Sequence, residues 1–202
     1  MSAISGAPAA TAFHPVSLVV TDDLHRSRLT VFFRLILAIP AFFVLAAWSI
    51  LAGIVVFIAW IIGIFTGRLP EWFHDTLSGY IRYVTRVNAY LLLLANPWPT
   101  FGRTPYPVDV HIEPPAEQSR LTIAFRMILA IPALLISSVF RIVNNLIAFL
   151  GWFYSLIFGR MHEGMRNTSA WLFKYELQTY AYIYLLTARY PSLSGAPELP
   201  TQ

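Results

Sequence analysis

The residues with the most obvious chemical potential are Glu71, His74 and Asp75, which follow one another closely in the first half of the chain. On a helix this spacing places a carboxylate and an imidazole on one face, as in the metal sites of some helix bundles. Ninety-two residues further on, the corresponding residues are Glu163, Arg166 and Asn167. Because an arginine cannot take the place of a metal ligand, we predict no metal site, and we expect both glutamates to favour helix N-termini.

No other pattern indicates a reaction. His111 and Glu113 lie two apart on a predicted strand, where such residues are usually surface groups. The chain has no cysteine, which excludes thiol catalysis and cysteine-ligated metals. It contains no GxSxG, HExxH, GxGxxG or Walker motif, and no Lys/Arg cluster typical of nucleic-acid binding. We therefore predict a protein that is not an enzyme, uses no cofactor and binds no nucleic acid.

Several cations are candidates for contact with lipid headgroups. Arg82 and Arg86 are four residues apart, so they share a face of a helix and could bind a lipid phosphate. The alternative is ordinary charge at a membrane interface, with no specific ligand. The full set of candidates for headgroup contact is Arg68, Arg82, Arg86, Arg160 and Lys174.

A second group of polar residues, Arg141, Asn144 and Asn145, interrupts an apolar run near its midpoint. Polar residues inside such a run are functional candidates by default, because hydrocarbon solvates them poorly. They could mark the apex of a helical hairpin, or they could contact a partner helix or a lipid headgroup. We treat them as candidates for an apex or for a partner contact.

The composition is that of a membrane protein. Of the 202 residues, 57% are hydrophobic and only 12% are charged, and the formal net charge is +4. Soluble domains carry about 25% charged residues. The run from residue 29 to 66 contains one charge, Arg34. Residues 1–12 have no basic segment followed by an apolar one, so they are not expected to be a cleaved signal peptide.

The chain is a tandem duplication with a shift of 92 residues and no gap. The sequence SRLT occurs at 27–30 and again at 119–122, and ILAIPA occurs at 36–41 and again at 128–133. Trp60 falls on Trp152 in the same register. We therefore divide the chain as follows: a disordered N-terminus (1–12), repeat one (13–99), a linker (100–105), repeat two (106–193) and a disordered C-terminus (194–202).

Each repeat has the same order of segments. An alternating stretch at 15–20 and at 107–112 predicts a short strand, and the two copies could pair with each other. A polar turn and a long apolar run follow. The last part, 71–95 and 163–187, predicts an amphipathic helix at the membrane interface. The aromatic residues expected to anchor it are Trp72, Tyr80, Tyr83, Tyr90 and Trp98 in repeat one, and Trp171, Tyr175, Tyr180, Tyr182, Tyr184 and Tyr190 in repeat two.

The apolar run can be placed in three ways. As one helix, residues 35–65 would measure roughly 46 Å, whereas the hydrocarbon core is about 30 Å thick. The run could cross once with a kink at Pro40, could cross and return through residues 71–95, or could fold into a hairpin. We favour the hairpin, because it moves Arg141 away from the bilayer centre. The expected fold is mainly α and integral to the membrane: two tandem repeats, each a short strand, a long hydrophobic helical hairpin (or kinked transmembrane helix) and an interfacial amphipathic helix.

The order of these segments resembles a bacterial membrane family, domain of unknown function 4389. The resemblance rests on Leu37-Ala38-Ile39-Pro40, Trp60 and Thr66-Gly67-Arg68-Leu69-Pro70, with a second copy at Leu129 to Pro132, Trp152 and Phe158-Gly159-Arg160. It covers nearly the whole chain. It implies an integral protein of the bacterial cytoplasmic (inner) membrane, multi-pass or re-entrant, and implies no activity.

Three functions are compatible with these features. The first is a non-enzymatic scaffold or accessory subunit of a larger membrane complex. The second is a lipid-binding or membrane-shaping protein, because paired hairpins with amphipathic helices would expand one leaflet. The third is a small transporter with a site between the repeats. The expected partners are membrane lipids, together with other membrane proteins or a second copy of the chain.

Overall fold

The computed structural model describes residues 14–67, 69–102, 104–113 and 118–200. The disorder predicted for residues 1–12 lies outside this part of the chain. Repeat one forms β1 (Val16–Val20), α1 (Arg28–Phe32), α2 (Arg34–Thr66) and α3 (Glu71–Leu91). Repeat two forms β2 (Val108–Ile112), α4 (Arg120–Ala124), α5 (Arg126–Leu129), α6 (Ile131–Phe158) and α7 (Glu163–Ile183).

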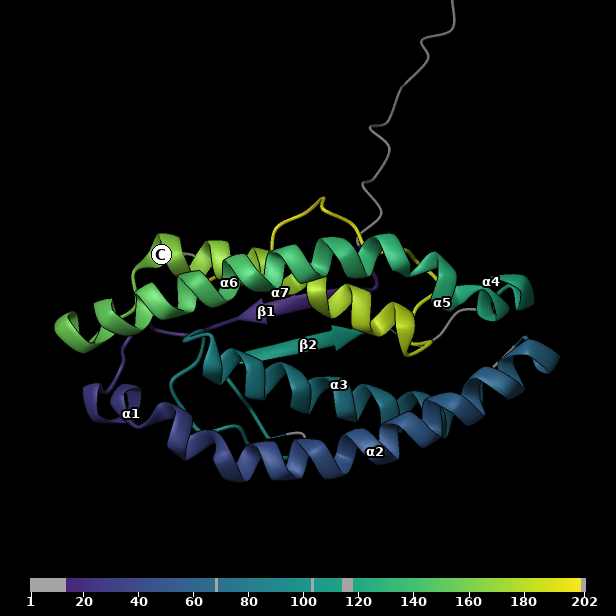
Figure 1. The fold of residues 1–202 in the computed structure, drawn as a ribbon, viewed down its shortest axis with the longest axis horizontal. Helices are drawn as coiled ribbons and strands as arrows, with labels where there is room; N and C mark the ends of the chain where they lie inside the picture. The colour runs from purple at the N-terminus through teal and green to yellow at the C-terminus, as the bar shows by residue number, and fades with distance from the viewer. Residues whose placement is uncertain (1–13, 68, 103, 114–117, 201–202) are drawn as a thin grey trace, which may run out of the picture.

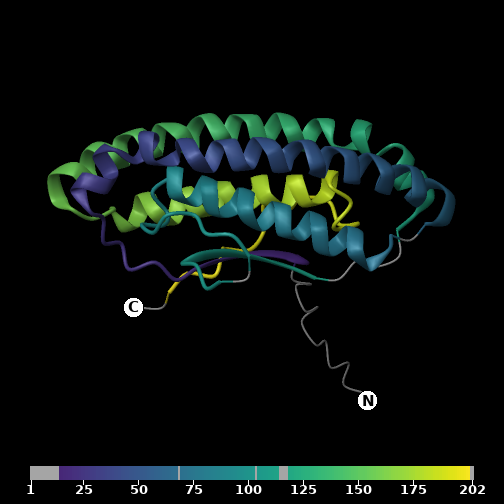
Figure 2. The ribbon, with the colours of Figure 1, turned by 90° about the horizontal axis from the view of Figure 1, so that it is seen from below.

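The elements are arranged in three layers that run along a common long axis (Figures 1 and 2). The long helices α2 and α6 form one outer layer and run in opposite directions. The helices α3 and α7 lie beneath them, and the two-stranded sheet lies on the far side. Figure 2 also shows that α2 and α6 bow gently, with the convex side facing away from the sheet.

The predicted pairing of the two strands is confirmed. β1 and β2 are antiparallel, and Leu18 is paired with Val110. These two residues are equivalent in the two repeats, since they lie 92 apart in sequence. The strand pair is therefore centred on a pseudo-twofold axis that relates one repeat to the other.

The predicted hairpin is wrong. α2 continues without a turn through Pro40 and Gly53, and α6 continues through residues 141–145. A glycine in a helix costs only about 1 kcal/mol relative to alanine, so Gly53 is not enough to reverse the chain. In repeat two the proline effect is clearer: α5 ends at Leu129 and α6 starts at Ile131, with Pro132 in its first turn, where a proline is tolerated.

The amphipathic segments are helices, as predicted, but their tyrosines are mostly packed inside the protein. α3 packs against α2 on one side and β2 on the other, and α7 packs in the same way between α6 and β1. Because both sides are covered, most of their tyrosines are buried. The tyrosines with 7% or less of their surface exposed are Tyr80, Tyr83, Tyr90, Tyr175 and Tyr182. By contrast, Trp72 and Trp98 remain exposed.

The two repeats exchange their first helices. α1 of repeat one packs on α6 of repeat two, and α4 of repeat two packs on α2 of repeat one. Trp60 Nε1 donates a hydrogen bond to the carbonyl of Ile123 (2.9 Å), and its counterpart Trp152 donates to the carbonyl of Val31 (2.8 Å). Each repeat therefore completes the long helix of the other.

The C-terminal segment adds to the sheet layer, although the sequence predicts disorder there. Glu198 forms a parallel bridge with Val19, and its backbone N–H donates to the carbonyl of Leu18 at 2.9 Å. The free edge of β1 supplies these backbone partners, because β1 pairs with β2 only along its other edge. Residues 194–200 thus have a defined place, and 201–202 lie outside the described residues.

Candidate functional site

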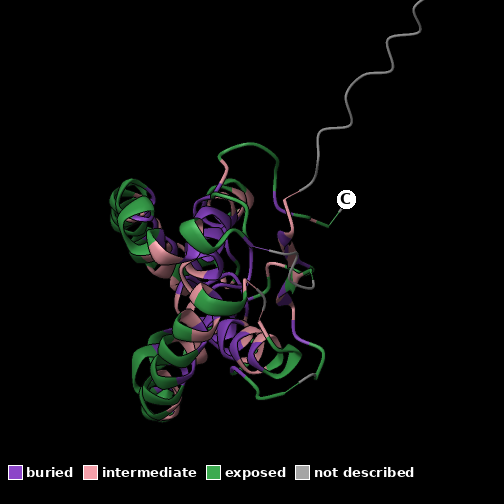
Figure 3. Ribbon diagram, turned by 90° about the vertical axis from the view of Figure 1, so that its right-hand side faces the viewer, coloured by how far each residue is buried: buried purple, intermediate pink, exposed green. Residues whose placement is uncertain are grey.

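The outer side of the long helices is exposed (Figure 3), and many of the exposed side chains there are large and apolar. Within the described chain, the segments Arg34–Thr66 and Arg126–Phe158 are each 33 residues long and apolar enough to cross a membrane. Only 17% and 22% of their most apolar windows are buried, whereas the core helix of a soluble protein is mostly buried. These two helices support membrane association. We call the exposed large side chains of α2 and α6 the apolar face, represented by Leu35, Ile50, Phe65, Leu135, Ile142 and Ile157.

The buried side of the same helices carries small residues. Large apolar side chains point outward and small ones point inward, which is the reverse of a soluble core helix. Small residues let two helix backbones approach closely, which is how helices pack in membranes. We call this row the small-residue seam, and it consists of Ala38, Ala41, Ala52, Ala59 and Gly63 in α2, and Ala133, Ser137, Gly151 and Ser155 in α6.

We expect Ala59→Leu to lower the free energy of unfolding by about 1–3 kcal/mol, because the seam has no room for three more carbons. Ala59 is 0% exposed and belongs to the core cluster. The control is Ala47→Leu in the same helix, where the side chain is exposed and the change should stay within about 0.5 kcal/mol. Denaturant unfolding of both variants in the same detergent gives the comparison. Equal losses at the two positions would contradict an inward seam.

The polar group in the middle of α6 is not a hairpin apex, because the helix continues through it. Side chains of α7 supply partners for two of its three residues. The guanidinium of Arg141 lies 2.7 Å from a carboxylate oxygen of Glu176 and also contacts the hydroxyl of Tyr180. Asn144 is buried and accepts a hydrogen bond from Ser169 Oγ. Asn145 is exposed. A continuous helix can therefore carry these residues without exposing them all to lipid.

Two equivalent arginines donate hydrogen bonds to backbone carbonyls at the C-terminal ends of α3 and α7. Arg126 is buried and donates to the carbonyls of Tyr182 (2.6 Å) and Thr187 (3.0 Å). Its guanidinium lies over the Tyr182 ring, 4.5 Å from the ring centroid. Arg34 repeats the pattern with Tyr90 and Ala95, and lies 4.3 Å from the Tyr90 ring centroid. A cation at a helix C-terminus satisfies carbonyls that lack a helical partner.

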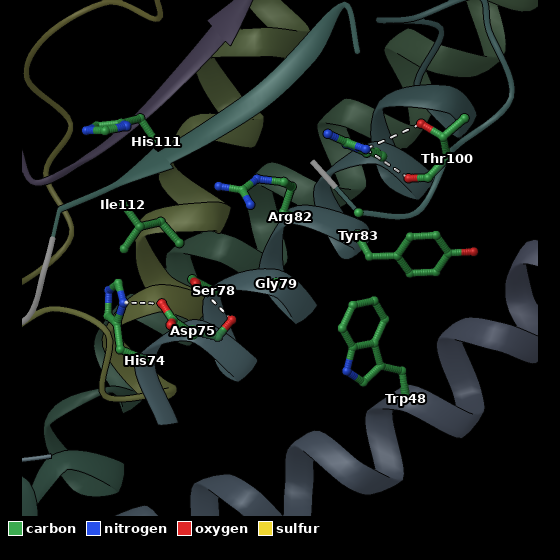
Figure 4. A pocket seen from close by; sticks show the side chains of 12 residues that line it. Trp48, His74, Asp75, Ser78, Gly79, Arg82, Tyr83, Thr100, His111 and Ile112 are labelled. Atoms are coloured by element: carbon green, nitrogen blue, oxygen red, sulfur yellow. Dashed lines mark hydrogen bonds and ion pairs between the residues drawn. The ribbon is translucent and has the colours of Figure 1, made fainter. Parts of the chain in front are cut away.

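A polar pocket of about 390 Å³ opens beside α3 in repeat one. Figure 4 shows its side chains converging from three elements and one loop. α2 contributes an indole, α3 contributes imidazole and guanidinium groups, β2 contributes a second imidazole, and the loop after α3 contributes a threonine. We call this the polar pocket; the residues that matter below are Trp48, His74, Arg82, Arg86, Thr100 and His111.

One carboxylate holds both arginines of the polar pocket. Arg82 Nε and Arg86 Nη2 each lie 3.2 Å from a different oxygen of Asp109. Arg86 is otherwise fixed by the loop, because it donates to the carbonyls of Thr100 (3.0 Å) and Thr104 (2.8 Å). Arg82 is part exposed and is held by the protein through Nε. Two cations thus share one anion, and within the described part of the chain Asp109 is the one acceptor for Arg82.

The wall of the polar pocket nearest to α2 is aromatic. Trp48 and Tyr83 have ring centroids 5.6 Å apart, and Tyr83 stacks on Phe101 at 4.2 Å. Phe101 also stacks on Trp48. These rings separate the charged groups from the apolar face, so the pocket combines a polar interior with an amphipathic wall.

The equivalent place in repeat two carries different side chains with different partners. Gly79 of the polar pocket corresponds to Trp171, which packs on Phe140 at 5.5 Å. Lys174, the counterpart of Arg82, donates to the carbonyls of Ser194 and Gly195 in the C-terminal segment. Burial lowers the pKa of Lys174 below its ordinary value. The two copies have therefore diverged at this place.

The other predicted cations are scattered. Arg160 is exposed near the end of α6, away from the polar pocket. Arg68 lies outside the described residues. The structure brings Arg82 and Arg86 together with His74 and His111, which sequence reasoning treated separately. These side chains come together because β2 pairs with β1 and packs on α3. The sequence alone carries no signal for this contact.

A second cavity, of about 420 Å³, lies between the repeats and is lined mainly by apolar groups. It is bounded by α2 of repeat one, with Trp60 and Phe57, and by the end of α7, with Tyr184. Arg126 reaches it, but its Nη groups are occupied by carbonyls and by Gln118. Such a lining does not favour a polar solute. Across the described residues, no three His, Cys, Asp or Glu side chains gather as metal ligands.

The fold and the surface define a mainly helical protein of two interlocked repeats. Two of its helical segments are long and apolar enough to cross a membrane. The family model described as Domain of unknown function (DUF4389) matches residues 28–102 and 120–194, one match for each repeat. The chain belongs to this family, with two tandem copies of its domain, as the sequence resemblance indicated. No curated protein and no solved structure matches the chain.

Proposed function

We propose that the protein inserts from one side into a single leaflet, with α2 and α6 lying in the plane of the membrane, and that it interacts with lipids there. The observation that carries this proposal is the distribution of side chains on the long helices. Their large apolar residues form one continuous outer layer, while the sheet and its charged residues form the opposite layer. Amphipathic structures of this kind lie in the interface rather than across it.

The dimensions of the long helices support the in-plane arrangement. At about 1.5 Å per residue, α2 is about 50 Å long, so crossing a core of about 30 Å would need a tilt of about 53°. Transmembrane helices tilt by about 0–40°. α3 packs along α2 and β2 packs on α3, and all three run along the same long axis (Figure 1), so a crossing by α2 would carry the charged residues of α3 and β2, such as Arg82 and Asp109, into hydrocarbon. Each charge there costs at least about 2.5 kcal/mol.

In this proposal the chain performs no reaction, its partners are lipids, and its bilayer is the bacterial cytoplasmic membrane that the family resemblance implies. Wedge-like insertion of two long helices into one leaflet would expand that leaflet. A scaffold role would instead place another membrane protein over the apolar face. The two differ in what touches that face, lipid or protein.

Single cysteines distinguish these arrangements, because the native chain contains none. The variants Leu35→Cys, Ile50→Cys and Phe65→Cys place an NBD label at the start, middle and end of α2, where the side chains are 72%, 69% and 73% exposed. The labelled protein is added to preformed vesicles. We expect dithionite added outside to reduce the labels at both ends, and lipid-carried nitroxides to quench all three.

Ala196→Cys, exposed in the C-terminal segment, is the control that should stay in water and escape quenching by the lipid. If only one end of α2 is reduced from outside, the helix crosses the bilayer and the proposal is wrong. If the three α2 labels are protected from both reagents in native membranes but not in vesicles, another protein covers the face, which supports the scaffold role.

A further inference from the structure

We propose that the polar pocket of repeat one binds the phosphate ester of an anionic phospholipid headgroup. The polar pocket is distinct from the apolar face, which needs no headgroup specificity. The inference that a phosphate group binds rests on the polar pocket alone. The inference that this phosphate belongs to a lipid also rests on the proposed insertion of α2 and α6.

The charge balance of the polar pocket favours an anion. Arg82 and Arg86 share the single carboxylate of Asp109 at 3.2 Å each. The other carboxylate at the polar pocket, Asp75, is 72% exposed, so water screens its charge. The planar guanidinium group offers two parallel N–H donors that match two phosphate oxygens, whereas a lysine ammonium acts as a point charge.

Unused donors at the polar pocket point to a missing acceptor. The Arg86 side chain is only 1% exposed, and its Nε is buried without a hydrogen-bond partner. His74 Nε2 is also buried without a partner. Among the described residues, Asp109 alone accepts from Arg82, through Nε. Buried polar groups normally have partners, so a ligand or water that accepts from Arg86 Nε would complete its hydrogen bonding.

The aromatic wall indicates what the acceptor is attached to. Trp48 belongs to α2, the helix that carries the apolar face, and Figure 4 shows its ring beside Tyr83 on the side of the pocket toward α2. With α2 in the headgroup region, these rings would lie at the depth where Trp and Tyr concentrate. A headgroup could therefore enter the polar pocket while its acyl chains stay beside α2.

The comparison of the two repeats supports a ligand rather than a packing fault. In repeat two Trp171 stands at the position of Gly79 and packs on Phe140, and the C-terminal segment accepts hydrogen bonds from Lys174. Repeat two thus carries a bulkier side chain at this place and no arginine pair. Repeat one keeps Gly79, where an added Cβ would meet Trp48 only at the ordinary distance of 3.7 Å. The pair of arginines beside a glycine is thus specific to repeat one.

The test uses Gly79→Trp, which introduces the residue that repeat two already carries, and Arg82→Gln, which removes the exposed cation. Arg160→Gln is the control, because it removes an equal charge outside the polar pocket. Each full-length protein is placed in nanodiscs of phosphatidylcholine with a minor fraction of phosphatidylglycerol. Native mass spectrometry then counts the lipid retained by each chain. Glycerol 3-phosphate, titrated calorimetrically, is the soluble arm.

We expect the wild type to retain one phosphatidylglycerol, Gly79→Trp and Arg82→Gln to lower that retention about tenfold, and Arg160→Gln to leave it unchanged; tenfold corresponds to about 1.4 kcal/mol. Equal retention by the wild type and by both pocket variants would overturn the proposal. Binding of glycerol 3-phosphate without retention of lipid would overturn the lipid source and leave the phosphate site.

Flotation with phosphatidylcholine vesicles separates this proposal from the proposed function. All four proteins should float equally, because none of these changes touches the apolar face. If the wild type does not float, the insertion proposal fails, and the soluble arm alone then decides the phosphate site. If Gly79→Trp does not fold by near-UV circular dichroism, Arg82→Gln still supplies the comparison.

Discussion

Replacing Arg126 by methionine should lower the free energy of unfolding by about 3 kcal/mol or more, because it leaves buried acceptors without donors. Arg126 donates to the carbonyls of Tyr182 and Thr187 and to the side chain of Gln118, and it is 1% exposed. Methionine fills much of the same volume but offers no donor. The Thr187 carbonyl would then lose its guanidinium donor, and the Tyr182 carbonyl would keep the backbone N–H of Leu185.

Denaturant unfolding in one detergent, followed by tryptophan fluorescence, measures this loss. The matched control is Arg120→Met, an exposed arginine six residues earlier, which should change the stability by less than about 0.5 kcal/mol. Arg34→Met should also be strongly destabilising, but less so, since Arg34 holds two carbonyls and no side chain. A loss at Arg126 no larger than at Arg120 would show that the contacts are not needed.

Residues 1–105 and 106–202, expressed separately, should each fail to fold, and they should form the native structure when expressed together. Neither half has a partner for its strand, since β1 pairs with β2. Each half also lacks the carbonyl that its tryptophan needs, because Trp60 reaches Ile123 and Trp152 reaches Val31. A two-stranded sheet without its second strand has no independent stability.

A tag on residues 1–105 provides the measurement. Co-expression should allow both halves to be purified in equal amounts with native near-UV circular dichroism, whereas either half alone should aggregate or remain disordered. Trp60→Phe in the tagged half is a milder variant that should weaken the association without abolishing it. A single repeat with a cooperative unfolding transition of its own would contradict the interlocked arrangement.

Local pattern was enough to predict much of this fold. The 92-residue shift predicts the duplication, and the alternation at 15–20 and 107–112 predicts the strands within one residue. The pairing of the strands follows from the duplication, because two equivalent short strands need a partner each. The segments predicted at 71–95 and 163–187 begin where α3 and α7 begin and extend four residues beyond the ends of these helices, at Leu91 and Ile183.

The errors arose where a tertiary partner decided the outcome. Arg141 indicated a turn only because its sequence neighbours offer no counter-charge, and Glu176, 35 residues away, supplies one. The tyrosines of α3 and α7 suggested an interface because their sequence mixes aromatic and charged residues, yet the sheet covers their second side. Neither contact has a signal in the local pattern.

The candidate site was predictable only in part. The helical spacing of Arg82 and Arg86 correctly places both at one site, and the polar pocket contains them. The roles of Asp109 and His111 depend on how β2 packs against α3, which no spacing reveals. Comparison of Gly79 with Trp171 at equivalent positions was the one sequence signal that could have located the opening.

The small-residue seam also bears on how freely these helices can drift in sequence. Ala38 and Ala41 correspond to Ala130 and Ala133, Ala59 to Gly151 and Gly63 to Ser155, so four of the five seam positions of α2 stay small after duplication; the fifth, Ala52, corresponds to Asn144. On the outer side Phe43 has become Leu135 and Phe65 has become Ile157, one large apolar residue replacing another. The inner row of the long helices is therefore constrained mainly in side-chain size, whereas the outer positions need only remain large and apolar.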